Sequence, residues 1–451
     1  MFLNTTTTDL EIHFNSVGTK IDRLAATSPR AGLLSPSLSV IPRSGQRPEY
    51  DPVLMSYFEH VICSSSTLVD NAHYNPYRYL ILPMALESEG LYHATLAIAA
   101  NTLRLSDPRY RLPALEHHHL ALSHLRGLLN YDTWEEKELD EMLGLVLMLC
   151  WFDISDNSRP SWVTHLNGFQ DLIRTRQNRP GRSDHSKELS SFFNRYFAFH
   201  LVLARTAFKV NPETCQAYVL PDTLLETPDT IDPYMGFSPS LLLLINQVTE
   251  LAGHNERDQQ VMGAQRVYDL KRRLEEIQQK LPSEQIDPDT ECASIAEANR
   301  LGALLLLHET CSSKAGSASS TQLPSLDSKE KSQYVDQILK LILTKKSNMM
   351  RTAVLPLWPL FLAGCCAREE EERVIVLQLF GELESIRRFG NITPAMEVVE
   401  MVWRQQDLAG SDDRRPQKNG SPDLENDPLQ GARFAWEHAM AMLGDWKVSL
   451  T

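Results

Sequence analysis

The stretch that decides the fold is LDEMLGLVLMLC, residues 139–150. Its large apolar side chains, such as Leu139, Met142 and Val146, recur three and four residues apart and so share one face of a helix. The longest apolar run, residues 145–152, is far shorter than the roughly 20 residues that a bilayer-spanning helix needs. We therefore expect a buried helix of a soluble protein, with no membrane association.

The same helical period recurs along the chain from Tyr50 onward, and Ser88 with Glu89 has the composition of a helix N-terminus. Pro113 is expected to open a helix whose apolar stripe holds Leu115, Leu122, Leu125 and Leu129. We expect helices within 54–62, 91–105, 113–129, 139–150 and 162–173, and at 188–209, 239–253, 258–281, 291–311, 330–347, 359–365, 370–389, 394–407 and 432–449. No alternating run is bounded by a hairpin turn. The prediction is an all-α fold, a large irregular multi-helix domain of about 14–18 helices without significant sheet.

Composition divides the chain into two parts. Residues 1–48 are rich in Ser, Thr, Pro and Gly and are predicted to form a disordered tail or linker. Residues 49–451 are predicted to form the helical domain, with flexible surface loops near 177–187, 312–329 and 409–431, where polar and helix-breaking residues gather.

Charge and cysteine usage narrow the function. The chain carries 44 basic and 58 acidic side chains, a net charge of −14, and such a surface repels nucleic acid. We therefore expect no specific DNA binding by this chain alone. The seven cysteines are odd in number and irregularly spaced, which favours reduced thiols in an intracellular protein over a disulfide framework.

Five short patterns follow one another along residues 50–451. They are NPYR at 75–78 leading to LPMALES at 82–88, WVTHLNGF at 162–169, IDPYMGFS at 231–238, LWPLFLAGC at 357–365, and Trp403 with the later Trp436 and Trp446. In this order they resemble the fungal-specific transcription factor domain that follows the zinc cluster in many fungal regulators. The resemblance implies an all-helical regulatory domain of a transcription regulator in the nucleus, or shared between nucleus and cytoplasm, and not an enzyme.

The zinc cluster itself is missing from these residues. Such a cluster uses six cysteines with paired Cys-x-x-Cys thiolates, whereas Cys63 is the single cysteine before Cys150 and no Cys-x-x-Cys occurs. We expect the protein to act through a DNA-binding regulator or co-regulator, as a homodimer, or as part of a longer gene product. The resemblance allows for a small-molecule effector and for control of a metabolic or secondary-metabolite gene cluster. The alternative is a helical interaction or small-molecule-binding scaffold without a direct transcriptional role.

Several motif residues also have a physical interpretation. Trp358 stands between Pro356 and Pro359, so we expect it at a helix entrance, wedged between neighbouring helices. On the helix around 162–173, His165 is expected to be a buried, hydrogen-bonded histidine, and Gly168 is expected to let another backbone approach.

No constellation with catalytic chemistry is found. His117, His118, His119 and His124 are predicted to lie on a helix surface, because they lack the spacing by which i and i+3 or i+4 side chains share one metal ion. Cys365 and Cys366 are predicted to be buried thiols. We assign no catalytic, cofactor-binding or metal-binding residue and expect no cofactor.

Overall fold

The computed structural model describes residues 50–131, 133–177, 186–209, 227–253, 262–282, 291–315, 323–350, 352–387, 389–412 and 432–451. Within these ranges lie fifteen α-helices and no strand, and β-type pairing is limited to isolated bridges, Thr230 with Lys280 and Asp232 with Phe237. The all-α prediction is confirmed. The predicted tail, 1–48, and most of the predicted loops lie outside the described residues. No helix of the described part has the length and apolar character that crossing a membrane requires.

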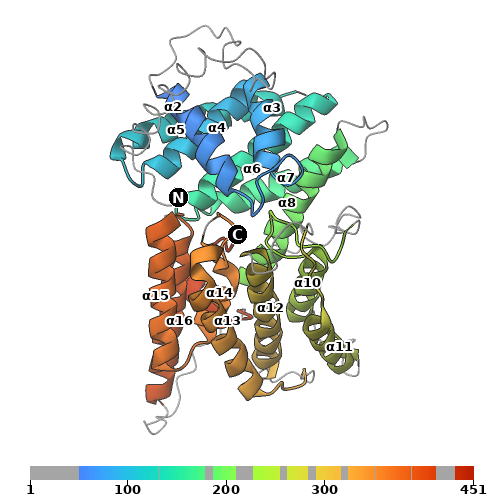
Figure 1. Ribbon diagram of the computed structural model, residues 1–451, viewed down its shortest axis with the longest axis vertical. Coiled ribbons are helices and arrows are strands. Elements are labelled where there is room, and N and C mark those ends of the chain that lie inside the picture. Colours follow the sequence, from blue (N-terminus) through green and yellow to red (C-terminus); the bar gives the residue numbers. More distant parts are fainter. Residues whose placement is uncertain are drawn as a thin grey trace, which may run out of the picture.

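The helices form two layers, one above the other in Figure 1. The upper layer consists of α2 (Asp51–Tyr57), α3 (Leu82–Glu87), α4 (Glu89–Leu103), α5 (Arg111–Leu129), α6 (Glu136–Ser155) and α7 (Ser161–Gln177), with π-helical turns η1 (Phe58–Cys63) and η2 (Tyr77–Ile81) and a 3-10 turn η3 (Pro108–Tyr110). α4 packs against both α5 and α6, and α7 packs along α6.

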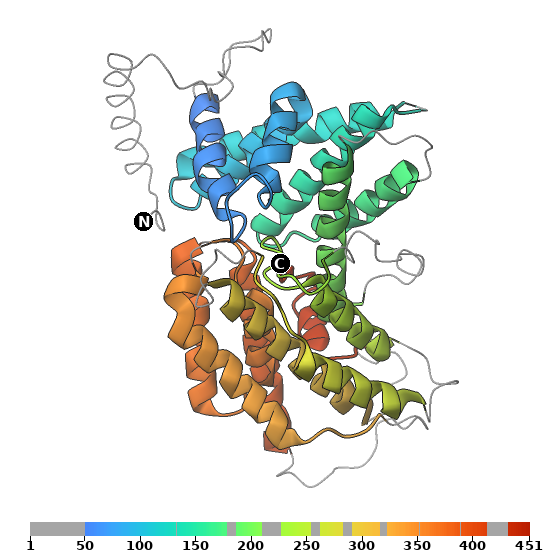
Figure 2. The ribbon, with the colours of Figure 1, turned by 45° about the vertical axis from the view of Figure 1, so that its right-hand side comes forward.

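The lower layer holds the rest of the described helices. It consists of α10 (Pro239–Gly253), α11 (Met262–Glu276), α12 (Glu291–Ala315), α13 (Ser328–Met349), α14 (Leu357–Cys366), α15 (Glu370–Arg387), α16 (Ile392–Asp412) and α17 (Ala435–Met442). α8 (Ser186–Ala207), green in Figure 2, runs from the upper layer to the lower one and packs on α7 and on α10.

Local sequence explains where the upper helices begin. The Ser88 hydroxyl accepts a hydrogen bond from the Leu91 backbone N–H at 3.1 Å and so caps α4, as predicted. Glu135 and Glu138 form a capping box at the start of α6. Nearly every side chain of α6 from Leu139 to Cys150 is buried, which confirms the helix that the opening stretch predicts.

Two predicted helices end earlier in the structure. The helix predicted at 258–281 stops at Glu276, because Lys280 turns away and exchanges backbone hydrogen bonds with Asp229 and Ile231. The helix predicted at 432–449 stops at Met442, because Gly444 adopts a φ of +96° that a right-handed helix does not contain. The chain then returns to the boundary between the layers (Figures 1 and 2).

The buried face of α5 differs from the predicted one. The predicted stripe ran through Leu115, Leu122, Leu125 and Leu129, but Leu115 and Leu129 are 43% and 49% exposed. The side that faces the core instead holds Ala114, His117, Ala121 and Leu125. Small side chains let α5 lie close to α4, and polar partners from other elements compensate for burial of the histidine.

Gly168 does not mark a close approach, which corrects a second expectation. A Cβ atom built at this position of α7 would meet nothing within 4 Å. The close approaches lie elsewhere. A Cβ at Gly302 of α12 would come within 3.1 Å of the Trp358 ring, and one at Gly390 within 2.2 Å of the Ser155 carbonyl oxygen.

Candidate functional site

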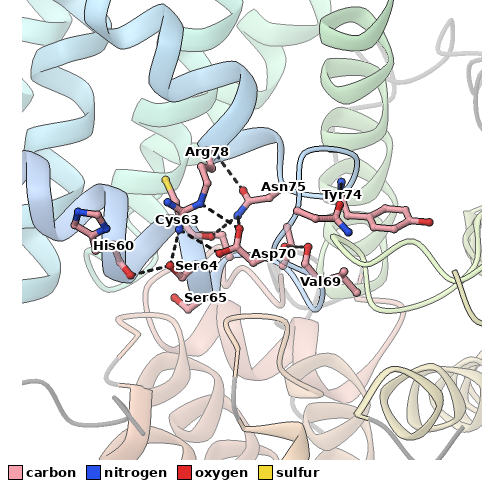
Figure 3. Close-up of polar contacts among 12 residues, drawn as sticks. His60, Cys63, Ser64, Ser65, Val69, Asp70, Tyr74, Asn75 and Arg78 are labelled. Carbon is pink, nitrogen blue, oxygen red and sulfur yellow. Dashed lines mark hydrogen bonds and ion pairs between the residues drawn. The ribbon is translucent and has the colours of Figure 1, made fainter. Parts of the chain in front are cut away.

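The NPYR pattern at 75–78 ties the start of η2 to the chain that precedes it (Figure 3). The Asn75 side chain is fully buried, and its Nδ2 donates to the Cys63 carbonyl and to Asp70 Oδ1, each at 2.7 Å. Its Oδ1 accepts from the Arg78 backbone N–H at 3.1 Å. The Asn75 side chain therefore hydrogen-bonds to backbone groups on both sides of it in the sequence, the Cys63 carbonyl and the Arg78 N–H.

Arg78 completes this network from the other side. Its Nε and Nη2 donate to the two oxygens of Asp70, each at 3.1 Å, and Nη2 also donates to Ser64 Oγ at 2.6 Å (Figure 3). A planar guanidinium that binds a carboxylate with two parallel hydrogen bonds holds its orientation well. Residues 64–75, which this network closes into a loop, are called the strap below.

The strap reaches the lower layer through backbone groups. The Ser65 carbonyl accepts from the Ala353 N–H at 2.7 Å, and the Leu68 N–H donates to the Pro233 carbonyl at 2.9 Å. Tyr74 Oη donates to the carbonyl of Pro282 at 2.8 Å. The NPYR pattern therefore joins the two layers.

Beside the strap, a cavity of about 110 Å³ lies between the layers. The upper layer contributes Tyr77 and Trp151 to its wall, α8 contributes Tyr196 and His200, and the lower layer contributes Asn299 and Trp358. No Asp, Glu, Lys or Arg side chain lines it. The upper layer, α8 and the lower layer therefore all contribute to a cavity whose wall holds no charged side chain.

Aromatic rings form a large part of the cavity wall. The Tyr77 and Trp151 rings lie 4.7 Å apart, and those of Tyr196 and Tyr234 are stacked at 6.2 Å. Burial raises the pKa of Tyr77 and of Tyr196 far above the usual tyrosine value. The hydroxyls therefore stay protonated, and the wall carries no phenolate charge.

His200 presents a hydrogen-bond acceptor in this cavity. Its Nδ1 lies 2.9 Å from the Tyr196 carbonyl oxygen, which can only accept, so Nδ1 carries the proton. Burial lowers the pKa of His200 from 6.5 to about 4, so the ring is neutral at pH 7. Nε2 is consequently an unprotonated acceptor, and within the described residues it has no hydrogen-bond partner.

Asn299 provides a second acceptor. Its Nδ2 donates to the Ile295 carbonyl one turn earlier in α12, at 2.9 Å, which leaves Oδ1 free to accept. The residue is 4% exposed, and Oδ1 has no hydrogen-bond partner in the described part of the chain. Two buried acceptors therefore stand in a cavity that aromatic and aliphatic residues line together with a few other polar ones.

Four tryptophans of the family-like patterns bind backbone or side-chain groups far away in sequence. Trp358 Nε1 donates to Thr206 Oγ1, Trp436 Nε1 to the Thr206 carbonyl, Trp162 Nε1 to the Lys447 carbonyl and Trp403 Nε1 to the Gly364 carbonyl. Trp358 is the second residue of α14 and is buried, so the prediction of a wedge at a helix entrance is confirmed.

The histidines of α5 do not form the surface run that we predicted. His117 is buried, with Nε2 at 3.3 Å from Asp51 Oδ1 and Nδ1 at 3.0 Å from Nδ1 of His93. His124 pairs with Glu141 at 2.8 Å. Within the described residues, no group of three or more His, Cys, Asp or Glu is arranged to hold a metal ion.

Two further local predictions are tested by the structure. His165 is only partly buried and lies 3.3 Å from Asp153 Oδ2 without a hydrogen bond to it, so the prediction of a buried, hydrogen-bonded histidine is not confirmed. Cys365 and Cys366 are buried thiols, as predicted, and burial raises the pKa of both. Neither thiol is therefore a thiolate at neutral pH.

The cavity acceptors were missed by sequence reasoning. His200 lies in FFNRYFAFHLVLA, residues 192–204, where one imidazole stands within a long apolar and aromatic run. That contrast could have marked it as a candidate. Asn299 has no comparable local signal, because only the fold brings residues of α12 and α8 to the same cavity.

These layers, the strap and the cavity define an all-α domain with a cavity between its layers. The chain belongs to the family of the fungal specific transcription factor domain, whose model matches residues 53–451. The resemblance to this domain is confirmed. The chain is similar to the acriflavine sensitivity control protein acr-2 of Neurospora crassa, with 21% identity over 390 residues that cover 79% of this chain. The chain spans 62% of that relative's length. No solved structure matches it.

Proposed function

We propose that this protein senses a small effector in the cavity and regulates genes through a DNA-binding unit that its 451 residues do not contain. The observation that carries the proposal is that both layers and α8 share the cavity wall. A ligand that fits one arrangement of the layers better than another shifts the population toward it. The partner then binds the protein surface that this change in the arrangement of the layers creates.

The partner is a DNA-binding regulator, a co-regulator or a second copy of the chain, and the site of action is the nucleus. The net charge of −14 and the lack of any Cys-x-x-Cys support an indirect contact with DNA. The target genes belong to a metabolic or secondary-metabolite cluster. We assign the chain no catalytic role.

Transcript profiling of a deletion strain tests the regulatory role, with the reintroduced gene as the control. A coherent set of genes should change and recover. Chromatin immunoprecipitation should place the protein at their promoters, while the purified chain should bind the same DNA weakly and without sequence preference. Tight specific binding by the chain alone contradicts the partner-dependent mechanism. A tagged protein that stays out of nuclei under all conditions supports the scaffold alternative.

A further inference from the structure

We propose that the cavity takes a neutral single-ring aromatic molecule with a hydrogen-bond donor, of the phenol class, whose hydroxyl donates to His200 Nε2 or to Asn299 Oδ1. This inference rests on the proposed function, which makes the cavity the effector site. It adds the chemical class of the effector and the protein atoms that bind the effector.

The size of the cavity limits the ligand to one ring. Its volume is about 110 Å³, and an apolar cavity of about 150 Å³ in another protein binds benzene. Flat rings such as Tyr77 and Trp151 favour an aromatic ligand, because offset and edge-to-face contacts add to the burial of apolar surface.

The polar groups of the wall require a ligand that donates. Most protein donors here are already used within the protein. Ser66 donates to Ile62, Ser155 to Phe152, Tyr196 to Leu147, Asn391 to Ser449 and Trp358 to Thr206. The Tyr77 and Tyr234 hydroxyls interact with each other. Three side-chain atoms of the described wall, His200 Nε2, Asn299 Oδ1 and Asn391 Oδ1, have no hydrogen-bond partner, and all three are acceptors.

The lack of charged side chains in the wall selects against ionic ligands. Burial of an ion without a counter-charge costs far more than burial of a neutral hydroxyl. Neither Lys or Arg for an anion nor Asp or Glu for a cation lines the cavity. A neutral donor is therefore the best match.

Four single-ring probes separate these requirements, namely phenol, benzene, benzylammonium and benzoate. Binding to the full-length protein is measured by thermal shift and by quenching of tryptophan fluorescence, since Trp151 and Trp358 line the cavity. We expect phenol to bind about tenfold more tightly than benzene, the effect of a hydrogen bond to a buried acceptor. The two ions should not bind detectably.

His200→Phe and Asn299→Leu remove one acceptor each while keeping the wall filled. The variant that removes the acceptor of the phenol hydroxyl should lower phenol affinity about five- to tenfold, and both variants should leave benzene affinity unchanged or higher. His308→Phe is the matched control, since His308 is equally buried in α12 but does not line the cavity. It should leave phenol affinity unchanged. Circular dichroism and the benzene measurement verify that each variant remains folded.

The outcomes distinguish this inference from the proposed function. If benzene binds as well as phenol, the cavity is a ligand site but the acceptor role is wrong. If benzylammonium binds best, the assignment of a neutral ligand is wrong. If none of the probes binds, the ligand class is contradicted, while the regulatory role is tested separately by transcript profiling of the deletion strain.

Discussion

Trp358 of α14 and Thr206 of α8 meet side chain to side chain, 152 residues apart in sequence, with Trp358 Nε1 donating to Thr206 Oγ1 at 2.9 Å. The Thr206 carbonyl accepts a second indole hydrogen bond, from Trp436 of α17 at 3.0 Å. One residue at the end of α8 therefore orients two buried tryptophans of the lower layer. Trp358 is also part of the cavity wall, so the hydrogen bond controls the shape of the cavity.

Thr206→Val should destabilise the protein by about 1–3 kcal/mol, because it leaves the buried Trp358 N–H without its acceptor. Urea unfolding followed by circular dichroism measures the change. Thr206→Ser keeps the hydroxyl and should lose much less stability. Equal losses in the two variants would assign the effect to the methyl group and not to the hydrogen bond.

Gly390→Ala should destabilise the protein by about 2–3 kcal/mol through overpacking, since its Cβ would lie 2.2 Å from the Ser155 carbonyl oxygen and 2.6 Å from the Asn157 nitrogen. These backbone atoms belong to the end of α6 and the turn after it, so the layers must shift apart. Gly381→Ala is the matched control in α15, where a Cβ meets nothing within 4 Å. It should stabilise by up to about 1 kcal/mol. Thermal unfolding of both variants provides the comparison, and a neutral Gly390→Ala would contradict the close contact.

Asn75→Ala should release the strap. The Cys63 carbonyl and Asp70 lose their donor, which costs about 1–3 kcal/mol for a buried group left unpaired. Limited proteolysis should show faster cleavage within 64–75 than in the wild-type protein. Asn71→Ala alters an exposed turn of the same loop and should change the cleavage rate much less. Equal rates of cleavage within 64–75 in the two variants would show that Asn75 does not hold the strap.

Acidification should destabilise the protein partly through His200 and His308. Burial lowers the pKa of each from 6.5 to about 4. The unfolded chain therefore binds protons that the folded chain does not, and stability present above pH 6.5 is lost as the pH falls toward 4. The slope reaches about 1.4 kcal/mol per pH unit for each group. Urea unfolding at pH 7, 6 and 5 should show a shallower dependence in His200→Phe and an unchanged one in His119→Gln, which alters an exposed side chain.

The sequence predicts the helices well where local signals agree. The helix at 239–253 has the predicted bounds, because Pro239 opens it and the turn before it contains Gly236 at a φ of +81°. The entrance of Trp358 into α14 follows in the same way from its two flanking prolines.

Features that depend on distant partners could not be predicted. The buried face of α5 was predicted wrongly because His117 contacts Asp51 and His93 in the core. No sequence pattern within α5 indicates these partners. The cavity was missed for the same reason. His200 and Asn299 line the same cavity only once α8 and α12 have taken their places in the fold.

The long sequence separation of the contacts between the layers sets the order in which the molecule assembles. Hydrogen bonds such as Trp358 to Thr206, Trp162 to Lys447 and Ser449 to Ser158 span 152, 285 and 291 residues. Closing such large loops is entropically slow, so each helical layer forms first from local contacts and the boundary closes last. Interactions that form after the transition state affect unfolding rather than folding. Occupancy of the cavity should therefore lengthen the lifetime of the native state without accelerating refolding.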